Sequence, residues 1–357
     1  MDHAKSSDPS SGHGKRPKGY PEPVITPPST QHTHTLIFLH GRGSNGERFG
    51  LEFLKAITSS GKTLRELYPG MKFIFPTAKK RRASAYNRAT IHQWFDLYSL
   101  ENPSECQDSQ YDGIRESSIF LHQLIDKEAE MIGLSNVVIG GLSQGCAIAL
   151  HVALNYTVQA SDTTEIESLD DVRPKTSSLG GFVGMSGWLP FADDIRDAAI
   201  GNSVAEEDYA VDDDLFEHSR SSLANIEFQD SDYPEESVNL YTLNMPDDSF
   251  SARQLRAANF CRDIIDLPLI SVSPHHLPPF AAVPFFLGHG ALDEKVTIRL
   301  GEEARDALNL LGLNVTWKVY GDLGHWYKVP NEIDDIVEFL KEKVGVESVE
   351  SKDNCFL

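Results

Sequence analysis

Residues 137–148, VVIGGLSQGCAI, place a serine between glycines, with an apolar run on either side. The two runs predict a buried strand followed by a helix. A strand, a G-x-S-x-G sequence and a helix are the context of a nucleophile elbow, a sharp turn that exposes the serine hydroxyl above a sheet. Gly141 and Gly145 suit such a turn, because a side chain there would collide with backbone. We therefore expect Ser143 to be a nucleophile; the alternative is a structural glycine-rich turn.

The alternation of strand and helix continues along most of the chain. Apolar runs predict strands at Thr35–Leu39, Lys72–Phe75, Asn136–Ile139, Gly181–Met185, Val283–Leu287 and Val315–Tyr320. Most of these runs lack polar alternation, which is typical of a parallel sheet covered by helices on both faces. Helical spacing predicts helices at Gly113–Ile132, Glu302–Leu311 and Asn331–Lys343. The pattern indicates an α/β fold with a mostly parallel central sheet flanked by helices.

The composition also suggests how the chain is divided. Residues 1–32 are polar and rich in Pro, Ser and Gly, which predicts a disordered arm before a single domain at 33–345. Two segments, at about 158–178 and 191–280, interrupt the strand-and-helix pattern and are predicted insertions in that domain. Residues 346–357 are expected to form a flexible tail.

The second insertion is strongly acidic. Residues 191–250 contain seventeen acidic and two basic residues, so we expect a solvated, largely flexible appendage. A lid or docking surface is the alternative, because long insertions in compact domains are often functional. As a lid, the acidic segment would fold over a basic loop at Lys79–Arg82 and Arg88. The alternative is that the acidic segment and the basic loop are both solvated and unrelated.

Charge and cysteine content exclude several classes of protein. The net charge of −21 would repel the phosphates of a nucleic-acid partner. The four cysteines are scattered without a C-x-x-C pair, which argues against a disulfide framework and a zinc site. No secretory signal is visible, and no stretch approaches the ~20 apolar residues of a membrane span. We expect a soluble cytoplasmic protein; the sequence does not set its oligomeric state.

A serine hydroxyl needs a base to accept its proton and an acid to orient that base. His325 directly follows the predicted strand Val315–Tyr320 and precedes the last helix, where a base is required; a histidine that only caps that helix is the alternative. The acid is expected from the loop after the preceding strand, and Asp293 is the favoured residue. Glu294 is the adjacent competitor. Asp322 competes less well, because it lies only three residues from His325 in the same loop.

The oxyanion of an acyl-transfer intermediate needs two backbone N–H donors near the nucleophile. Gln144, the residue after Ser143, would provide one. The loop in LHGRGSNG, residues 39–46, would provide the other through the N–H of Arg42. The alternative is a glycine-rich loop that only turns the chain or binds phosphate, although it lacks the Lys-Ser/Thr ending of a P-loop.

Several segments together resemble one family. They are TLIFLHGRGSNGERF, GGLSQGCAIAL, GFVGMSGWLP, FFLGHGALDEKV and YGDLGH, with FIFPTA and QWFD between the first two. In order and approximate spacing they are similar to the acyl-protein thioesterase/phospholipase/carboxylesterase family of small α/β-hydrolases. The resemblance implies an α/β-hydrolase fold and cleavage of thioesters of acylated proteins, lysophospholipids or small carboxylic esters.

The resemblance also assigns residues. Ser143 matches the family's nucleophile, Asp293 its acid and His325 its base, while Arg42 and Gln144 match its oxyanion donors. Trp94 resembles a residue that lines the family's active-site cleft; a core tryptophan is the alternative. The sequence departs from the family at Arg42, where an apolar residue is usual, and at Cys146, where the family has a second glycine.

These inferences predict a serine hydrolase that forms an acyl-enzyme on an ester or thioester substrate, without a metal or organic cofactor. Two alternatives remain open. The first is a catalytically weak interaction protein on a hydrolase scaffold, which would use the acidic insertion as its working surface. The second is a peptidase of the same fold.

Overall fold

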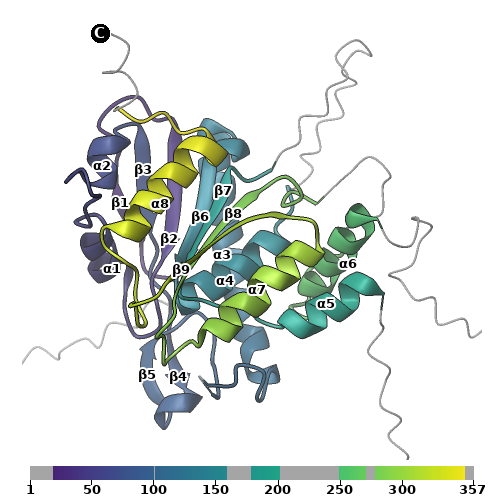
Figure 1. Ribbon diagram of the computed structural model, residues 1–357. Helices are drawn as coiled ribbons and strands as arrows, with labels where there is room; N and C mark the ends of the chain where they lie inside the picture. The colour runs from purple at the N-terminus through teal and green to yellow at the C-terminus, as the bar shows by residue number, and fades with distance from the viewer. Residues whose placement is uncertain (1–18, 100, 159–177, 202–248, 271–277, 350–357) are drawn as a thin grey trace, which may run out of the picture.

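The structure is a computed structural model that describes residues 19–99, 101–158, 178–201, 249–270 and 278–349 (Figure 1). Its centre is a seven-stranded sheet in the order β1-β3-β2-β6-β7-β8-β9. The strands are β1 (Val24–Thr26), β2 (His34–Leu39), β3 (Met71–Phe75), β6 (Val137–Leu142), β7 (Gly181–Met185), β8 (Pro284–Gly290) and β9 (Asn314–Tyr320). Only β1 runs antiparallel to its neighbour; the other pairs are parallel. The expected mostly parallel sheet is confirmed.

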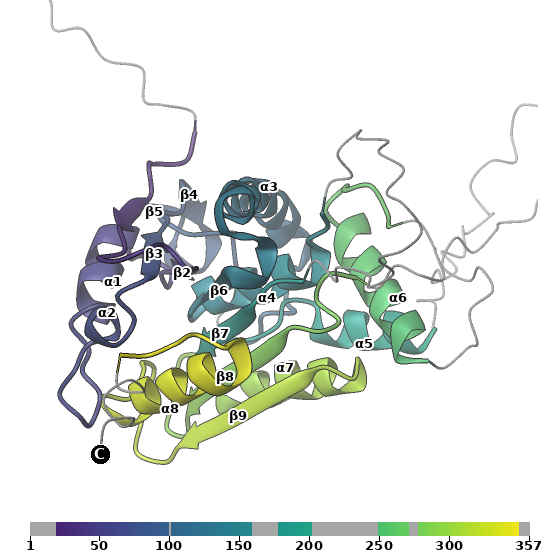
Figure 2. The ribbon, with the colours of Figure 1, turned by 90° about the horizontal axis from the view of Figure 1, so that it is seen from above.

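Helices cover both faces of this sheet, as Figures 1 and 2 show. One apolar cluster joins the sheet to α1 (Gly46–Phe53), α2 (Leu64–Leu67) and α8 (Asn331–Phe339). A second cluster, on the opposite face, includes α3 (Asp108–Ile132), α4 (Gln144–Asn155), α5 (Ala192–Ile200), α6 (Phe250–Asp263) and α7 (Ile298–Leu310). All twelve residues of α4 are buried, which accounts for its apolar sequence. This three-layer arrangement is that of the α/β-hydrolase fold.

A small hairpin stands apart from the main sheet. It consists of β4 (Lys80–Ala83) and β5 (Ala89–His92), joined through the short 3₁₀ turn Ser84–Tyr86. The predicted basic loop forms part of this hairpin. Lys79 and Arg81 pair with the exposed Glu116 on α3, at 3.1 and 2.6 Å, so two of its cations have a partner on a helix of the main domain.

The prediction of a disordered arm at 1–32 is wrong for residues 19–32. Strand β1 pairs with β3 and completes the edge of the sheet. The Tyr20 ring stacks on Phe120 with the ring centroids 4.0 Å apart, and the Tyr20 hydroxyl lies 2.9 Å from Ser117 Oγ. Backbone pairing and one aromatic side chain thus order a segment of polar composition. Residues 1–18 lie outside the described residues.

The predicted tail at 346–357 is likewise packed where it is described. Val346 is 3% exposed and donates its N–H to Leu340 O at 2.9 Å. Val349 donates its N–H to Leu67 O at 3.0 Å, which ties the chain to α2. The flexible-tail prediction is therefore wrong for 346–349, and residues 350–357 lie outside the described part.

The described ends of the second predicted insertion are helices rather than solvated chain. Ile195 and Ala199 of α5 are fully buried, as are Ala257, Ala258 and Cys261 of α6. Their helical spacing puts these apolar side chains on faces that pack into the core. The rest of the insertion, 202–248 and 271–277, lies outside the described residues, as does 159–177 of the first insertion. The hypothesis of an acidic lid concerns that undescribed part. Among the described helices, none has the length and apolar content needed to cross a bilayer.

Candidate active site

The candidate nucleophile sits in a strained turn between β6 and α4. Ser143 has φ 57° and ψ −124°, a left-handed conformation that costs energy for a residue with a side chain. The turn is held because Ser143 donates its N–H to Met185 O on β7 at 2.9 Å. Close packing explains the flanking glycines: a Cβ on Gly141 or Gly145 would come within 2.6 or 2.3 Å of Leu39 O. The local geometry is that of a nucleophile elbow.

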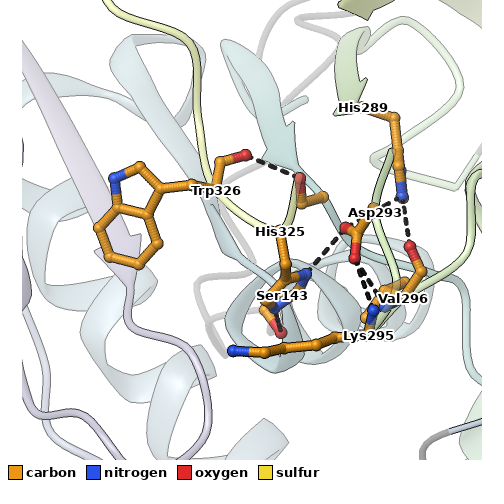
Figure 3. Close-up of polar contacts among 8 residues, drawn as sticks. Ser143, His289, Asp293, Lys295, Val296, His325 and Trp326 are labelled. Carbon is orange, nitrogen blue, oxygen red and sulfur yellow. Dashed lines mark hydrogen bonds and ion pairs between the residues drawn. The ribbon is translucent and has the colours of Figure 1, made fainter. Parts of the chain in front are cut away.

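Three residues from separate loops meet at the carboxyl edge of the sheet (Figure 3). Ser143 follows β6, Asp293 follows β8 and His325 follows β9. His325 Nε2 lies 2.9 Å from Ser143 Oγ, and His325 Nδ1 lies 2.8 Å from Asp293 Oδ2. The structure therefore brings together the serine, histidine and aspartate that the sequence proposes, in the chain order typical of α/β-hydrolases.

The Asp293 carboxylate is fixed by groups of its own loop. Its Oδ1 accepts hydrogen bonds from the N–H groups of Lys295 and Val296, both at 2.9 Å. Its Oδ2 lies 3.5 Å from His289 Nε2, which donates to Val296 O at 2.8 Å. Burial alone would raise the pKa of Asp293, but the contacts with His289 and His325 outweigh it and hold that pKa well below its usual range. Asp293 is thus an anion placed to accept a hydrogen bond from the Nδ1–H of His325.

The two competing acids lie elsewhere. Asp322 forms an ion pair with Lys328 and is exposed. Glu294 is exposed beside the buried Asp293, and neither competitor has a hydrogen bond with His325 among the described contacts.

The expected oxyanion loop runs close to the nucleophile. A Cβ built on Gly41 would lie 3.3 Å from Ser143 Cβ. His40 supports this loop through two hydrogen bonds. Its Nδ1 donates to Gly41 O at 2.8 Å, and its Nε2 accepts a hydrogen bond from the N–H of Ala78 at 3.0 Å. Burial lowers the pKa of His40 to about 4, so the ring is neutral near pH 7 and can make both bonds. Arg42 follows in this loop and lines the cleft beside Ser143.

Gln144 is the first residue of α4, where backbone N–H groups have no partner within the helix. Its side chain is used for support: Oε1 accepts the N–H of Trp94 at 3.0 Å, and Nε2 donates to Phe95 O at 2.8 Å. The backbone N–H groups of Arg42 and Gln144 remain the predicted oxyanion donors.

Trp94 does not line the cleft. Its side chain is fully buried, and its Nε1 donates to His40 O at 2.9 Å. The cleft assignment is wrong because the indole packs beneath the oxyanion loop and its polar atom is used inside the protein. Trp94 is a core residue that supports His40.

Cys146 marks the other departure from the family pattern. Its thiol is buried on the first turn of α4, and a Cβ on Gly184 or Gly187 would come within 2.6 or 2.5 Å of Sγ. Burial raises the pKa of this thiol, so it stays protonated. Cys146 fills space between α4 and β7 and is no second nucleophile.

The cleft in front of Ser143 has a volume of about 360 Å³. Its apolar wall includes Phe49, Leu142, Val296 and the half-exposed Trp326. Its charged lining residues are Arg42, Arg48, Glu52 and Lys295, with His325 beside Ser143. Within the described residues, no group of three His, Cys, Asp or Glu side chains could hold a metal ion.

Several of these residues escaped sequence reasoning. Arg48 and Phe49 lie at the end of the segment TLIFLHGRGSNGERF, and Tyr86 lies just after the predicted basic loop, but the sequence assigned no role to these side chains, and it is the fold that brings them to the cleft. His289 is one of the histidines after Ser143 that the sequence offers as a base, and it lies four residues before Asp293 at the end of the same strand. Its fixing role depends on the turn of the loop, which the sequence does not specify.

The fold and this arrangement of residues define a class, the α/β-hydrolases with a serine, histidine and aspartate at the sheet edge. A model of the phospholipase/carboxylesterase family matches residues 20–175. Acyl-protein thioesterase 1 of Schizosaccharomyces pombe is 34% identical over 170 residues, which are 47% of this chain and 62% of that protein. This aligned segment is less than two thirds of the relative's length.

Longer matches are weaker in identity. Acyl-protein thioesterase 1 of Gibberella zeae is 24% identical over 325 residues, covering 90% of this chain and 95% of that protein. The crystal structure of Zea mays acyl-protein thioesterase 2 is similar in fold, with a TM-score of 0.54, 23% identity and coverage of 91% of this chain and 100% of that one. The chain is therefore similar to the phospholipase/carboxylesterase family of α/β-hydrolases over residues 20–175.

Proposed function

We propose that this protein is a serine hydrolase that cleaves carboxylic ester or thioester bonds through an acyl-enzyme. The contact of His325 with both Ser143 Oγ and Asp293 Oδ2 is the observation that carries the proposal. The thioesterases among its relatives favour acylated proteins or other fatty-acyl esters as substrates.

The geometry suggests the division of roles. Ser143 Oγ attacks the substrate carbonyl while His325 Nε2 takes its proton. Asp293 keeps the proton of His325 on Nδ1 and stabilises the imidazolium that forms. The N–H groups of Arg42 and Gln144 bind the oxyanion; each such donor typically lowers the barrier by about 2.7–4 kcal/mol. His325 then protonates the leaving group and activates the water that hydrolyses the acyl-enzyme.

The first test removes the nucleophile. Ser143→Ala should lower kcat for p-nitrophenyl butyrate by at least about 10⁴-fold, because the acyl-enzyme can no longer form. A fluorophosphonate probe should label the wild-type protein and not the variant. The melting temperature of the variant serves as the control for folding.

Two outcomes would contradict the proposal. If Ser143→Ala keeps its activity while folded, Ser143 is not the nucleophile. If wild-type Ser143 is inert to the probe and no ester is cleaved, a non-catalytic interaction protein on this scaffold becomes the better reading.

A further inference from the structure

Three cations line the cleft in front of Ser143. Arg42 follows β2, Arg48 lies on α1, and Lys295 lies in the loop that carries Asp293. Figure 3 shows the Lys295 side chain extending past the Ser143 hydroxyl. Glu52 is the one acidic residue among the lining residues, so the cleft carries a positive excess in a chain whose net charge is −21.

These cations have no anionic partner in the part of the chain that the structure describes. Neither Arg42, Arg48 nor Lys295 makes a salt bridge there. Elsewhere several cations are paired, as Lys72 is with Glu128 at 2.6 Å and Lys318 is with Asp335 at 2.9 Å. No carboxylate of the described residues neutralises these charges, so a ligand in the cleft can contact them.

Arg42 has the strongest need for an acceptor. Its guanidinium carbon lies 4.6 Å from the centroid of the Tyr86 ring, which covers it from the hairpin. Its Nη1 and Nη2 are buried and make no hydrogen bond within the described residues. Buried charged donors without an acceptor are costly, and an anionic group in the cleft would relieve that cost. An arginine also suits the planar, two-oxygen face of a carboxylate or phosphate.

We propose that the preferred substrate is an ester or thioester that carries an anionic group, a carboxylate or a phosphate, close enough to the scissile carbonyl to contact Arg42, Arg48 and Lys295. This inference rests on the proposed hydrolysis at Ser143 and adds the charge of the substrate. The apolar wall holds the hydrocarbon part, and the cations hold the anionic group. A neutral ester of the same length lacks that second contact and reacts more slowly.

The kinetic test uses matched pairs of esters that differ in one charge. For the acyl side, p-nitrophenyl butyrate is compared with the mono-p-nitrophenyl ester of glutaric acid. For the leaving-group side, 1-butyrylglycerol is compared with 1-butyrylglycerol 3-phosphate. We expect kcat/KM to favour the anionic member of at least one pair by tenfold or more, and the pair that responds shows which side faces the cations. The preference should shrink as salt rises to 1 M, where charges are screened over about 3 Å.

Single substitutions assign the preference to residues. Arg42→Gln, Arg48→Gln and Lys295→Gln should each reduce the anionic-to-neutral ratio by about 2- to 5-fold, as expected for partly exposed ion pairs. Arg65→Gln is the matched control, because Arg65 is an exposed cation on α2 outside the cleft; it should leave the ratio unchanged. Equal or faster cleavage of the neutral member in both pairs would overturn the inference, as would an equal effect of Arg65→Gln.

A binding measurement separates this inference from the proposed reaction. Full-length Ser143→Ala is titrated calorimetrically with hexyl phosphate, hexanoate and hexanol. At least one of the two anions should bind tenfold or more tightly than hexanol, and Lys295→Gln in the same background should weaken it. If hexanol binds as well as both anions, the inference fails even where ester cleavage is observed. If an anion binds tightly but no ester is cleaved, the proposed hydrolysis fails and the anion site stands.

Discussion

At the scale of single residues, Asp293 has the most specific set of partners. Asp293→Asn keeps the shape of the side chain but replaces one accepting oxygen with a donor, so it favours the wrong tautomer of His325. We expect kcat to fall by about 10⁴-fold with little change in melting temperature. Ester hydrolysis by the purified variant measures this effect.

The matched control for that experiment is Asp322→Asn. Asp322 is much closer to His325 in sequence than Asp293 is, but it pairs with Lys328 at the surface. Its loss should change kcat less than about twofold. If Asp322→Asn lowers kcat strongly and Asp293→Asn lowers it only slightly, Asp322 and not Asp293 is the acid that orients His325.

The sequence located the residues that lie in a distinctive local context and did not locate those without one. Ser143 and His325 were found because a glycine-flanked turn and the loop after a strand fix where a side chain goes. Trp94 was wrongly assigned to the cleft because the sequence around it does not show whether its indole lines the cleft or lies in the core. The positions of Arg48 and Tyr86 in the cleft were missed because the sequence does not show which side chains of α1 and of the hairpin point towards Ser143.

At the scale of elements, the contact of α4 with β2 positions the nucleophile. A Cβ on Gly145 would lie 2.3 Å from Leu39 O and 2.7 Å from His40 O. Gly145→Ala should therefore push α4 away from β2, lower the free energy of unfolding by about 1–3 kcal/mol and reduce kcat. Urea unfolding and ester hydrolysis measure the two effects.

Gly321→Ala is the control for this substitution. Gly321 has no atom within 4 Å of a built Cβ, and its φ lies outside the positive range. It should be neutral in both measurements. If Gly145→Ala is as well tolerated as Gly321→Ala, the close approach of the two elements does not position Ser143.

Most long elements were predicted from the sequence, with ends shifted by a few residues. The buried strands and helices carry their own apolar periodicity, so local sequence is enough to recognise them. Strand β1 was missed because it has only three residues, and the hairpin β4–β5 because its strands are short and carry several polar side chains. Their structure comes from pairing with a neighbour, β3 in one case and each other in the second.

At the scale of the whole molecule, two fully buried histidines make stability depend on pH. Burial lowers the pKa of His40 to about 4 and that of His151 to about 3, whereas an unfolded histidine titrates near 6.5. Between pH 6.5 and 4 these two rings therefore bind more protons in the unfolded chain than in the folded one, so their contribution to the free energy of unfolding falls as pH falls.

Each of the two histidines should contribute about 1 kcal/mol per pH unit near pH 5. Urea unfolding at pH 7, 6, 5.5 and 5 measures the slope. His151→Leu removes one titrating group and should make the slope shallower by about 1 kcal/mol per pH unit. Burial raises the pKa of Glu332 to about 8, which gives a slope of the opposite sign between pH 7 and 5, so the difference between wild type and His151→Leu is the decisive quantity. An unchanged slope in His151→Leu would show that this ring is not held neutral by the fold.

The sequence by itself determined the α/β architecture, the resemblance to one family of hydrolases and the three residues proposed for catalysis. It could do so because strand periodicity, the glycines of the turn and the order of serine, aspartate and histidine are local properties of the chain. Only the tertiary structure decided that the segment at residues 19–32 completes the sheet, that Trp94 lies in the core and that three cations without an anionic partner among the described residues line the cleft of Ser143. These features depend on which distant segments of the chain pack against each other, and the sequence around a residue does not specify those contacts.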